Sequence, residues 1–74
     1  MKQLKPKEIV SFLKKHGYVE DHFTGAHLIM YHPKENKKVV VPVHKKDLPI
    51  GTLKAILKQT NLTIDNLKEF FKFE

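Results

Sequence analysis

The stretch YVEDHFTGAHLIMYHPKENKKVVVPVH, residues 18–44, decides the fold of this chain. Three runs rich in β-branched and aromatic residues follow one another in it: 18–23, 26–32 and 37–44. Two short turn signals separate these runs: Thr24-Gly25 and PKEN at 33–36. Such close spacing predicts an antiparallel meander, because tight turns join antiparallel neighbours. Pro42 lacks an N–H group, so we expect the third strand to lie at a sheet edge or to carry a bulge.

Helical patterns flank the three strands. Pro6 stands where a first helical turn would begin and Gly17 where the helix would end, and an apolar stripe lies between them, which predicts a helix over 6–16. After a loop at 45–51 the stripe returns over 52–60, and Asn61 can end that helix in the left-handed conformation. Thr63 is a suitable N-cap for a last short helix, with Phe70, Phe71 and Phe73 as packing residues.

These elements predict an α+β fold of order α-β-β-β-α, with a three-stranded antiparallel sheet, helices on one face and a short extra C-terminal helix. This is the order of double-stranded-RNA-binding domains. A length of 74 residues predicts one domain over 1–74 with a small core. The fold order alone is an analogy and does not establish a function.

Composition narrows the class of partner. The chain has 14 lysine or arginine residues against 8 acidic ones, and the formal net charge is +6. All the basic residues are lysine, which binds phosphates as a point charge and reads bases poorly. There is no cysteine, and the first 16 residues contain no continuous apolar segment. We therefore expect a cytoplasmic protein without a membrane span that binds a polyanion or an acidic protein.

Five histidines raise the question of a catalytic or metal site. His16 ends a helix, where a partial positive charge suits the dipole, and His22 lies in the most polar strand. His32 is five residues beyond His27, so strand alternation places the two on opposite faces. His44 could approach His27 from the adjacent strand. No spacing typical of a zinc site is present, and we expect neither a metal nor another cofactor.

A more specific signal comes from two segments together, TGAHLIMYHP at 24–33 and VVVPVHKKDLPIGTLKAILKQTNL at 39–62. Together they resemble the HicA (YcfA-like) toxins of bacterial toxin–antitoxin systems. The resemblance rests on Gly25 and His27 entering the second strand, on Pro42 and His44 closing the third, and on the helix opening GTLKAILKQ. With the first helix it covers roughly residues 6–62.

The resemblance implies a metal-independent endonuclease that cleaves mRNA, on a double-stranded-RNA-binding-like fold, neutralised by a HicB-type antitoxin that covers the active face. The catalytic histidine of the family corresponds to His27. Family members usually have a serine where this chain has Ala26. If that hydroxyl orients the histidine or a phosphate, its absence lowers the activity.

The chemistry of RNA cleavage favours the same residue. The reaction needs a base for the 2′-hydroxyl proton and an acid for the leaving 5′-oxygen, and imidazole can serve as either near neutral pH. We therefore predict His27 as the catalytic residue, with Gly25 and His44 in support and with Lys45, Lys46 and Lys54 as RNA-binding residues. Two alternatives remain: His27 is an ordinary sheet residue, and the protein is a non-catalytic module that binds duplex RNA or an acidic protein.

Overall fold

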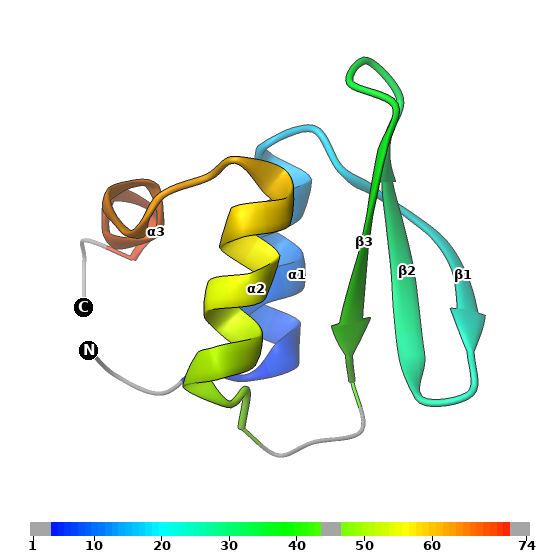
Figure 1. Ribbon diagram of the computed structural model, residues 1–74, viewed down its shortest axis with the longest axis horizontal. Coiled ribbons are helices and arrows are strands. Elements are labelled where there is room, and N and C mark those ends of the chain that lie inside the picture. Colours follow the sequence, from blue (N-terminus) through cyan, green and yellow to red (C-terminus); the bar gives the residue numbers. More distant parts are fainter. Residues whose placement is uncertain (1–3, 44–46, 72–74) are drawn as a thin grey trace.

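The computed structural model describes residues 4–43 and 47–71, which form a three-stranded sheet with the helices on one side of it (Figure 1). The elements follow in this order: α1 (Pro6–Lys15), β1 (Val19–Thr24), β2 (His27–His32), β3 (Lys37–Pro42), α2 (Ile50–Thr60) and α3 (Ile64–Phe70). The predicted α+β fold with an extra C-terminal helix is confirmed. The helix α3 lies beyond α2, on the side away from the sheet (Figure 1).

The ends of the elements differ from the predicted ones by one or two residues. The helix α2 begins at Ile50, two residues before the predicted start, because Pro49 is the N-cap with an extended backbone and the helix can start directly after it. Asn61 ends this helix in the left-handed conformation, as predicted. Thr63 is the N-cap of α3, and its hydroxyl accepts a hydrogen bond from the Asn66 backbone N–H at 3.0 Å. Phe73 lies outside the described residues.

The sheet has the order β1-β2-β3 and both of its pairings are antiparallel, so the meander is confirmed. Pro42 ends the edge strand β3, where its missing N–H disrupts no central pairing. The bulge lies instead in β1: the register passes from Glu20 opposite Met30 to His22 opposite Ile29, which leaves Asp21 as an extra residue. Pro42 thus marks the end of β3, whereas the bulge lies inside β1.

One apolar core joins the sheet to the helices. The sheet contributes alternate residues of β2 and β3, and α1 and α2 contribute their apolar stripes. The largest fully buried side chains are Ile9, Phe12, Leu13, Met30, Val39, Val41, Ile56 and Leu67. Phe12 of α1 also meets Phe70 of α3 edge to face, with ring centroids 5.6 Å apart, which ties the last helix to the first.

Two glycines sit where the chain reverses direction. Gly25 opens the two-residue turn between β1 and β2 with φ of 60°, and the space around it is open. Gly17, just after α1, has φ of 96°, and a Cβ there would lie 2.5 Å from His32 Nε2. His32 is itself held, because its Nδ1 accepts a hydrogen bond from the Glu35 backbone N–H at 3.0 Å. Gly17 therefore serves both the backbone conformation and the close packing of His32.

We predict that Gly17→Ala lowers the free energy of unfolding by about 1–3 kcal/mol from backbone strain alone, with a further cost from displacing His32. Gly51 is the matched control, since a Cβ there meets nothing within 4 Å and the residue lies in α2. Gly51→Ala should be neutral or stabilising by up to ~1 kcal/mol. Urea unfolding followed by circular dichroism measures both. Equal stability of the two variants would contradict this role of Gly17.

Tyr18 links the core to the strand ends and makes the stability of the fold sensitive to alkaline pH. The residue is buried, and its ring stands edge-on to that of His32 with centroids 4.9 Å apart. Burial, with a smaller contribution from the negative charge of Glu35, raises the pKa of the Tyr18 hydroxyl above its ordinary value of 10.0. Because the folded pKa lies above the unfolded one, the stabilisation is complete below pH 10 and is lost as the pH rises through the folded pKa.

We predict that Tyr18→Phe removes this loss, so that the wild-type protein loses more stability than the variant between pH 9 and pH 11. All other side chains are the same in both proteins, so the difference between the two isolates Tyr18. Urea midpoints measured across that range test the prediction. Parallel curves would show that the Tyr18 hydroxyl has no part in the alkaline response.

Candidate functional site

The face of the sheet turned away from the helices carries the candidate site. Directly opposed residues of antiparallel strands point to the same side, so the register assigns each side chain to a face. Leu28, Met30, Val39 and Val41 face the helices and are buried. We call the other side the open face, and its residues are Val19, His22 and Thr24 of β1, His27, Ile29 and Tyr31 of β2, and Lys38, Val40 and Pro42 of β3.

His27 is the first residue of the central strand and is exposed. It lies between Thr24 of β1 and Pro42 of β3, directly after the turn that Gly25 opens. Its end of the sheet is the end at which both α1 and α2 begin (Figure 1). An imidazole here is anchored by paired backbone on both sides and is accessible to a large substrate. The predicted separation from His32 is confirmed, because His32 lies on the helix side next to Gly17.

Of the other predicted site residues, one lies beside His27, one lies on another surface and three lie outside the described residues. Gly25 lies in the turn directly before the strand of His27, as expected. His44, Lys45 and Lys46 lie outside the described residues. Lys54 is exposed on α2, so it belongs to the helical layer and does not share the open face with His27. The structure thus joins Gly25 to His27 and leaves Lys54 on another surface.

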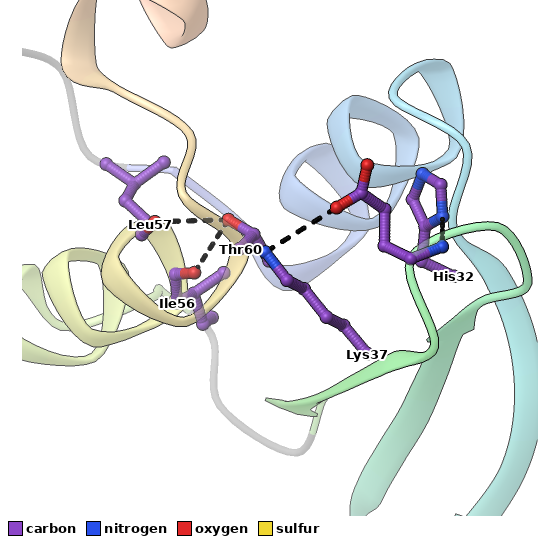
Figure 2. Close-up of polar contacts among 6 residues, drawn as sticks. His32, Lys37, Ile56, Leu57 and Thr60 are labelled. Carbon is purple, nitrogen blue, oxygen red and sulfur yellow. Dashed lines mark hydrogen bonds and ion pairs between the residues drawn. The ribbon is translucent and has the colours of Figure 1, made fainter.

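A polar hollow of about 240 Å³ lies at the opposite end of the sheet, between the end of α2 and the start of the β2–β3 turn. Its lining residues are His16, Tyr18, His32, Glu35, Lys37, Thr60, Asn61 and Leu62. Lys37 Nζ lies 3.7 Å from Glu35 Oε1, and the Thr60 hydroxyl donates to the Ile56 carbonyl oxygen at 2.9 Å and also approaches that of Leu57 at 3.2 Å (Figure 2). Lys37 and Glu35 pair with each other and the Thr60 hydroxyl bonds the backbone of its own helix, so we interpret the hollow as structural.

The acceptor role of His32 fixes its tautomer. Since Nδ1 accepts a hydrogen bond from the Glu35 backbone, the ring proton of the neutral imidazole is on Nε2, which points toward Gly17. His16 is the C-cap of α1, and its ring packs on Phe12 with centroids 4.8 Å apart. Both histidines therefore have local structural roles, and neither shares a face with His27.

A second, more apolar hollow lies between the beginning of α1 and the sheet, with a volume of about 470 Å³. Its walls include Val10, Leu28 and Val43, and Phe23 is 61% exposed at its rim. The bulge at Asp21 explains why Phe23 lies on this side of the sheet. Without the extra residue, strand alternation would place Phe23 on the open face and His22 on the helix side. The sequence offered no clear signal for this irregularity.

Two kinds of feature are absent from the described part of the chain. Within 4–43 and 47–71, no group of three or more histidines and carboxylates converges as metal ligands would. In the same part of the chain, none of the helices has the length and apolar character needed to cross a membrane.

Sequence reasoning missed two residues that accompany His27 on the open face, Tyr31 and Lys38. They are directly opposite one another in the β2–β3 pairing, and Lys38 is exposed. The signal was present, because alternation from His27 along β2 reaches Ile29 and then Tyr31. Lys38 could be assigned to this face only once the register with β3 was known.

Comparison with known proteins shows the family to which the chain belongs. A family model described as the HicA toxin of bacterial toxin–antitoxin systems matches residues 6–62. The match runs from the first residue of α1 to just beyond the end of α2, and so includes the whole sheet and His27. No curated protein matches the chain. Because the family match covers most of the sequence, the chain belongs to the HicA family of toxins from bacterial toxin–antitoxin systems.

Proposed function

We propose that this protein is the RNA-cleaving toxin of a type II toxin–antitoxin system and that His27 is its catalytic residue. The observation that supports this most directly is the exposed position of His27 at the start of β2, on a face that no described helix covers, within a chain of the HicA toxin family. The substrate is mRNA, which a protein of net charge +6 attracts. We expect it to act in the cytoplasm.

The proposed reaction is an internal transesterification. The imidazole of His27, as general base, takes the proton of the 2′-hydroxyl, and the 2′-oxygen attacks the adjacent phosphorus. The bond from phosphorus to the 5′-oxygen breaks, and that oxygen receives a proton from the imidazolium or from a second acid, for which His44 is the candidate. A 2′,3′-cyclic phosphate and a 5′-hydroxyl result. The reaction requires neither a metal ion nor an organic cofactor.

Positive charge must accompany this step, because negative charge builds up on the phosphate oxygens in the transition state. We propose Lys45, Lys46 and Lys54 as the lysines that hold the RNA backbone. Both α1 and α2 begin at the end of the sheet that carries His27 (Figure 1), and helix N-termini favour anions. Gly25 supports the site by forming the turn from which His27 projects.

The partner implied by the toxin family is an antitoxin, and we propose that it is of the HicB type and covers the face that carries His27. Blocking access to one exposed histidine is sufficient to stop the proposed reaction. The alternative function is a non-catalytic module that binds duplex RNA or an acidic protein. The basic charge of the protein supports this alternative as well as the first proposal. The alternative differs because it requires no role for His27.

We predict that His27→Gln lowers the rate of RNA cleavage by at least 10²-fold, because a general acid or base contributes typically 10²–10⁴. Purified protein is incubated with a labelled mRNA in the presence of EDTA, and the 2′,3′-cyclic phosphate ends are quantified. His16→Gln is the matched control and should retain wild-type cleavage. Cleavage by His27→Gln at the wild-type rate would show that another residue is catalytic. Binding of RNA without any product from the wild-type protein would favour the alternative function.

We predict that Lys54→Ala weakens binding to RNA and lowers the slope of log K against log salt by about one, as expected for the loss of one phosphate contact. The measurement is a fluorescence anisotropy titration at several salt concentrations, with the His27→Gln variant as background. Lys68→Ala, in the helix farthest from the sheet (Figure 1), removes the same charge and serves as control. An unchanged slope for Lys54→Ala would remove this residue from the binding surface.

A further inference from the structure

The open face combines an apolar centre with positively charged or ionisable groups. Val19 and Val40 are 48% and 44% exposed, and with Ile29 and Tyr31 they form an apolar and aromatic patch across all three strands. A chain of 74 residues has few apolar side chains to spare, so a patch left in water indicates a surface that binds something. Lys38 lies next to Tyr31, and His22 and His27 lie toward the other end of the same face.

The carboxylates near the sheet do little to make this face acidic. Asp21 accepts a hydrogen bond from His22 Nδ1 at 2.7 Å. Glu20 pairs with Lys14 of α1 at 2.8 Å, on the helix side. Glu35 pairs with Lys37, also on the helix side. The charge that the open face presents to a ligand is therefore positive or neutral. Such a face favours an anionic ligand over a positively charged one.

We infer that the open face binds single-stranded RNA, with a base stacked on Tyr31, the backbone near Lys38 and the scissile phosphate at His27; this rests on the proposed RNA-cleaving function. An open sheet face with a half-buried aromatic ring such as that of Tyr31 is suited to unpaired bases, because every base has a flat π-face that can stack on a ring. The bases of a duplex are already stacked and paired, so a duplex cannot use such a face.

The spacing along β2 suits this ligand. His27 and Tyr31 are four residues apart on the same face, about 13 Å at roughly 3.3 Å per residue. That length allows a few nucleotides between the stacked base and the cleaved bond, with Ile29 and Val40 beneath them. The Tyr31 hydroxyl donates to Asn36 Oδ1 at 2.9 Å, which fixes the ring before the ligand arrives. A preset ring loses less conformational entropy on binding.

This surface distinguishes the protein from a duplex binder with the same order of elements. Cleavage would require a single strand, and double-stranded segments of an mRNA would be spared. The lysines of the helical layer, such as Lys54, would then contact the strand where it leaves the sheet across β3, the strand nearest α2 in Figure 1.

The test measures binding apart from cleavage, in the His27→Gln background. The probe is a 12-nucleotide single-stranded RNA of mixed sequence with a 5′-fluorescein, compared with the same RNA annealed to its complement. We expect the single strand to bind at least tenfold more tightly than the duplex. Tyr31→Ala should weaken single-strand binding by about tenfold or more, which is the effect of losing one base–aromatic stack. Tyr31→Phe keeps the ring and loses only the hydrogen bond to Asn36, so it should bind much more tightly than Tyr31→Ala and only slightly more weakly than the background.

Two controls separate the open face from the rest of the molecule. Phe23→Ala removes an exposed aromatic residue that lies on the helix side of β1, and it should leave RNA affinity unchanged. Lys38→Glu should weaken binding several-fold and reduce the salt dependence, whereas Lys68→Glu, with the same change of charge on α3, should do neither. Circular dichroism of each variant shows whether a loss of binding reflects unfolding, and Tyr31→Leu replaces Tyr31→Ala if the latter is unfolded.

The outcomes distinguish this inference from the proposed function. If His27→Gln abolishes cleavage but Tyr31→Ala or Tyr31→Leu still binds single-stranded RNA at full affinity, no base stacks on Tyr31; the inference is then wrong and the catalytic proposal stands. Equal affinity for duplex and single strand also overturns the inference. If the Tyr31 variants lose the cognate antitoxin or self-association while keeping RNA, the face is a protein-docking surface. If Tyr31 governs RNA binding although His27→Gln still cleaves, the open face stands as the RNA surface, and the catalytic assignment fails together with the placement of the scissile phosphate at His27.

Discussion

The alternation of side chains along the central strand β2 is the constraint on which the rest of the structure depends. Leu28 and Met30 must be buried against the helices, and this alone turns His27, Ile29 and Tyr31 to the other side. A shift of one residue would bury the histidine and expose two core residues, at a cost of several kcal/mol for a chain with so small a core. The position of the candidate catalytic group is therefore enforced by the same contacts that stabilise the fold.

Most of the fold was predictable because its signals are local. Pro6 and Gly17 bound α1, the turns bound the strands, and Asn61 and Thr63 mark the change from α2 to α3. The bulge at Asp21 was not predictable, since it arises from competition between registers across two strands and no single residue announces it. It changes which side chains lie on each face, because it turns His22 to the open face and Phe23 to the helix side.

The candidate site was predictable to the extent that it follows from β2 itself. The exposure of His27 and its separation from His32 follow from alternation. The assignment of Lys38 to the open face depends on cross-strand register, and the accessibility of Tyr31 depends on the absence of any described helix over that face. A linear pattern reveals neither. Counting lysines along the sequence directed attention to residues 45, 46 and 54, whereas grouping by face selects Lys38 as the cation beside the apolar patch.

The backbone contacts of Ala26 indicate what a serine side chain, which is usual in the family at this position, would and would not affect. The Ala26 carbonyl oxygen accepts a hydrogen bond from the Val43 N–H at 3.0 Å, one step beyond the pairing of His27 with Pro42. The pairing alternates along an antiparallel ladder, so His27 and Pro42 form a non-hydrogen-bonded pair and the missing N–H of Pro42 faces the free edge of β3. The Ala26–Val43 bond continues the ladder past this pair. The backbone before His27 is thus fixed without any side-chain hydroxyl at residue 26. We therefore expect the loss of the serine to affect direct contact with a substrate phosphate, while the orientation of the strand that carries His27 is preserved.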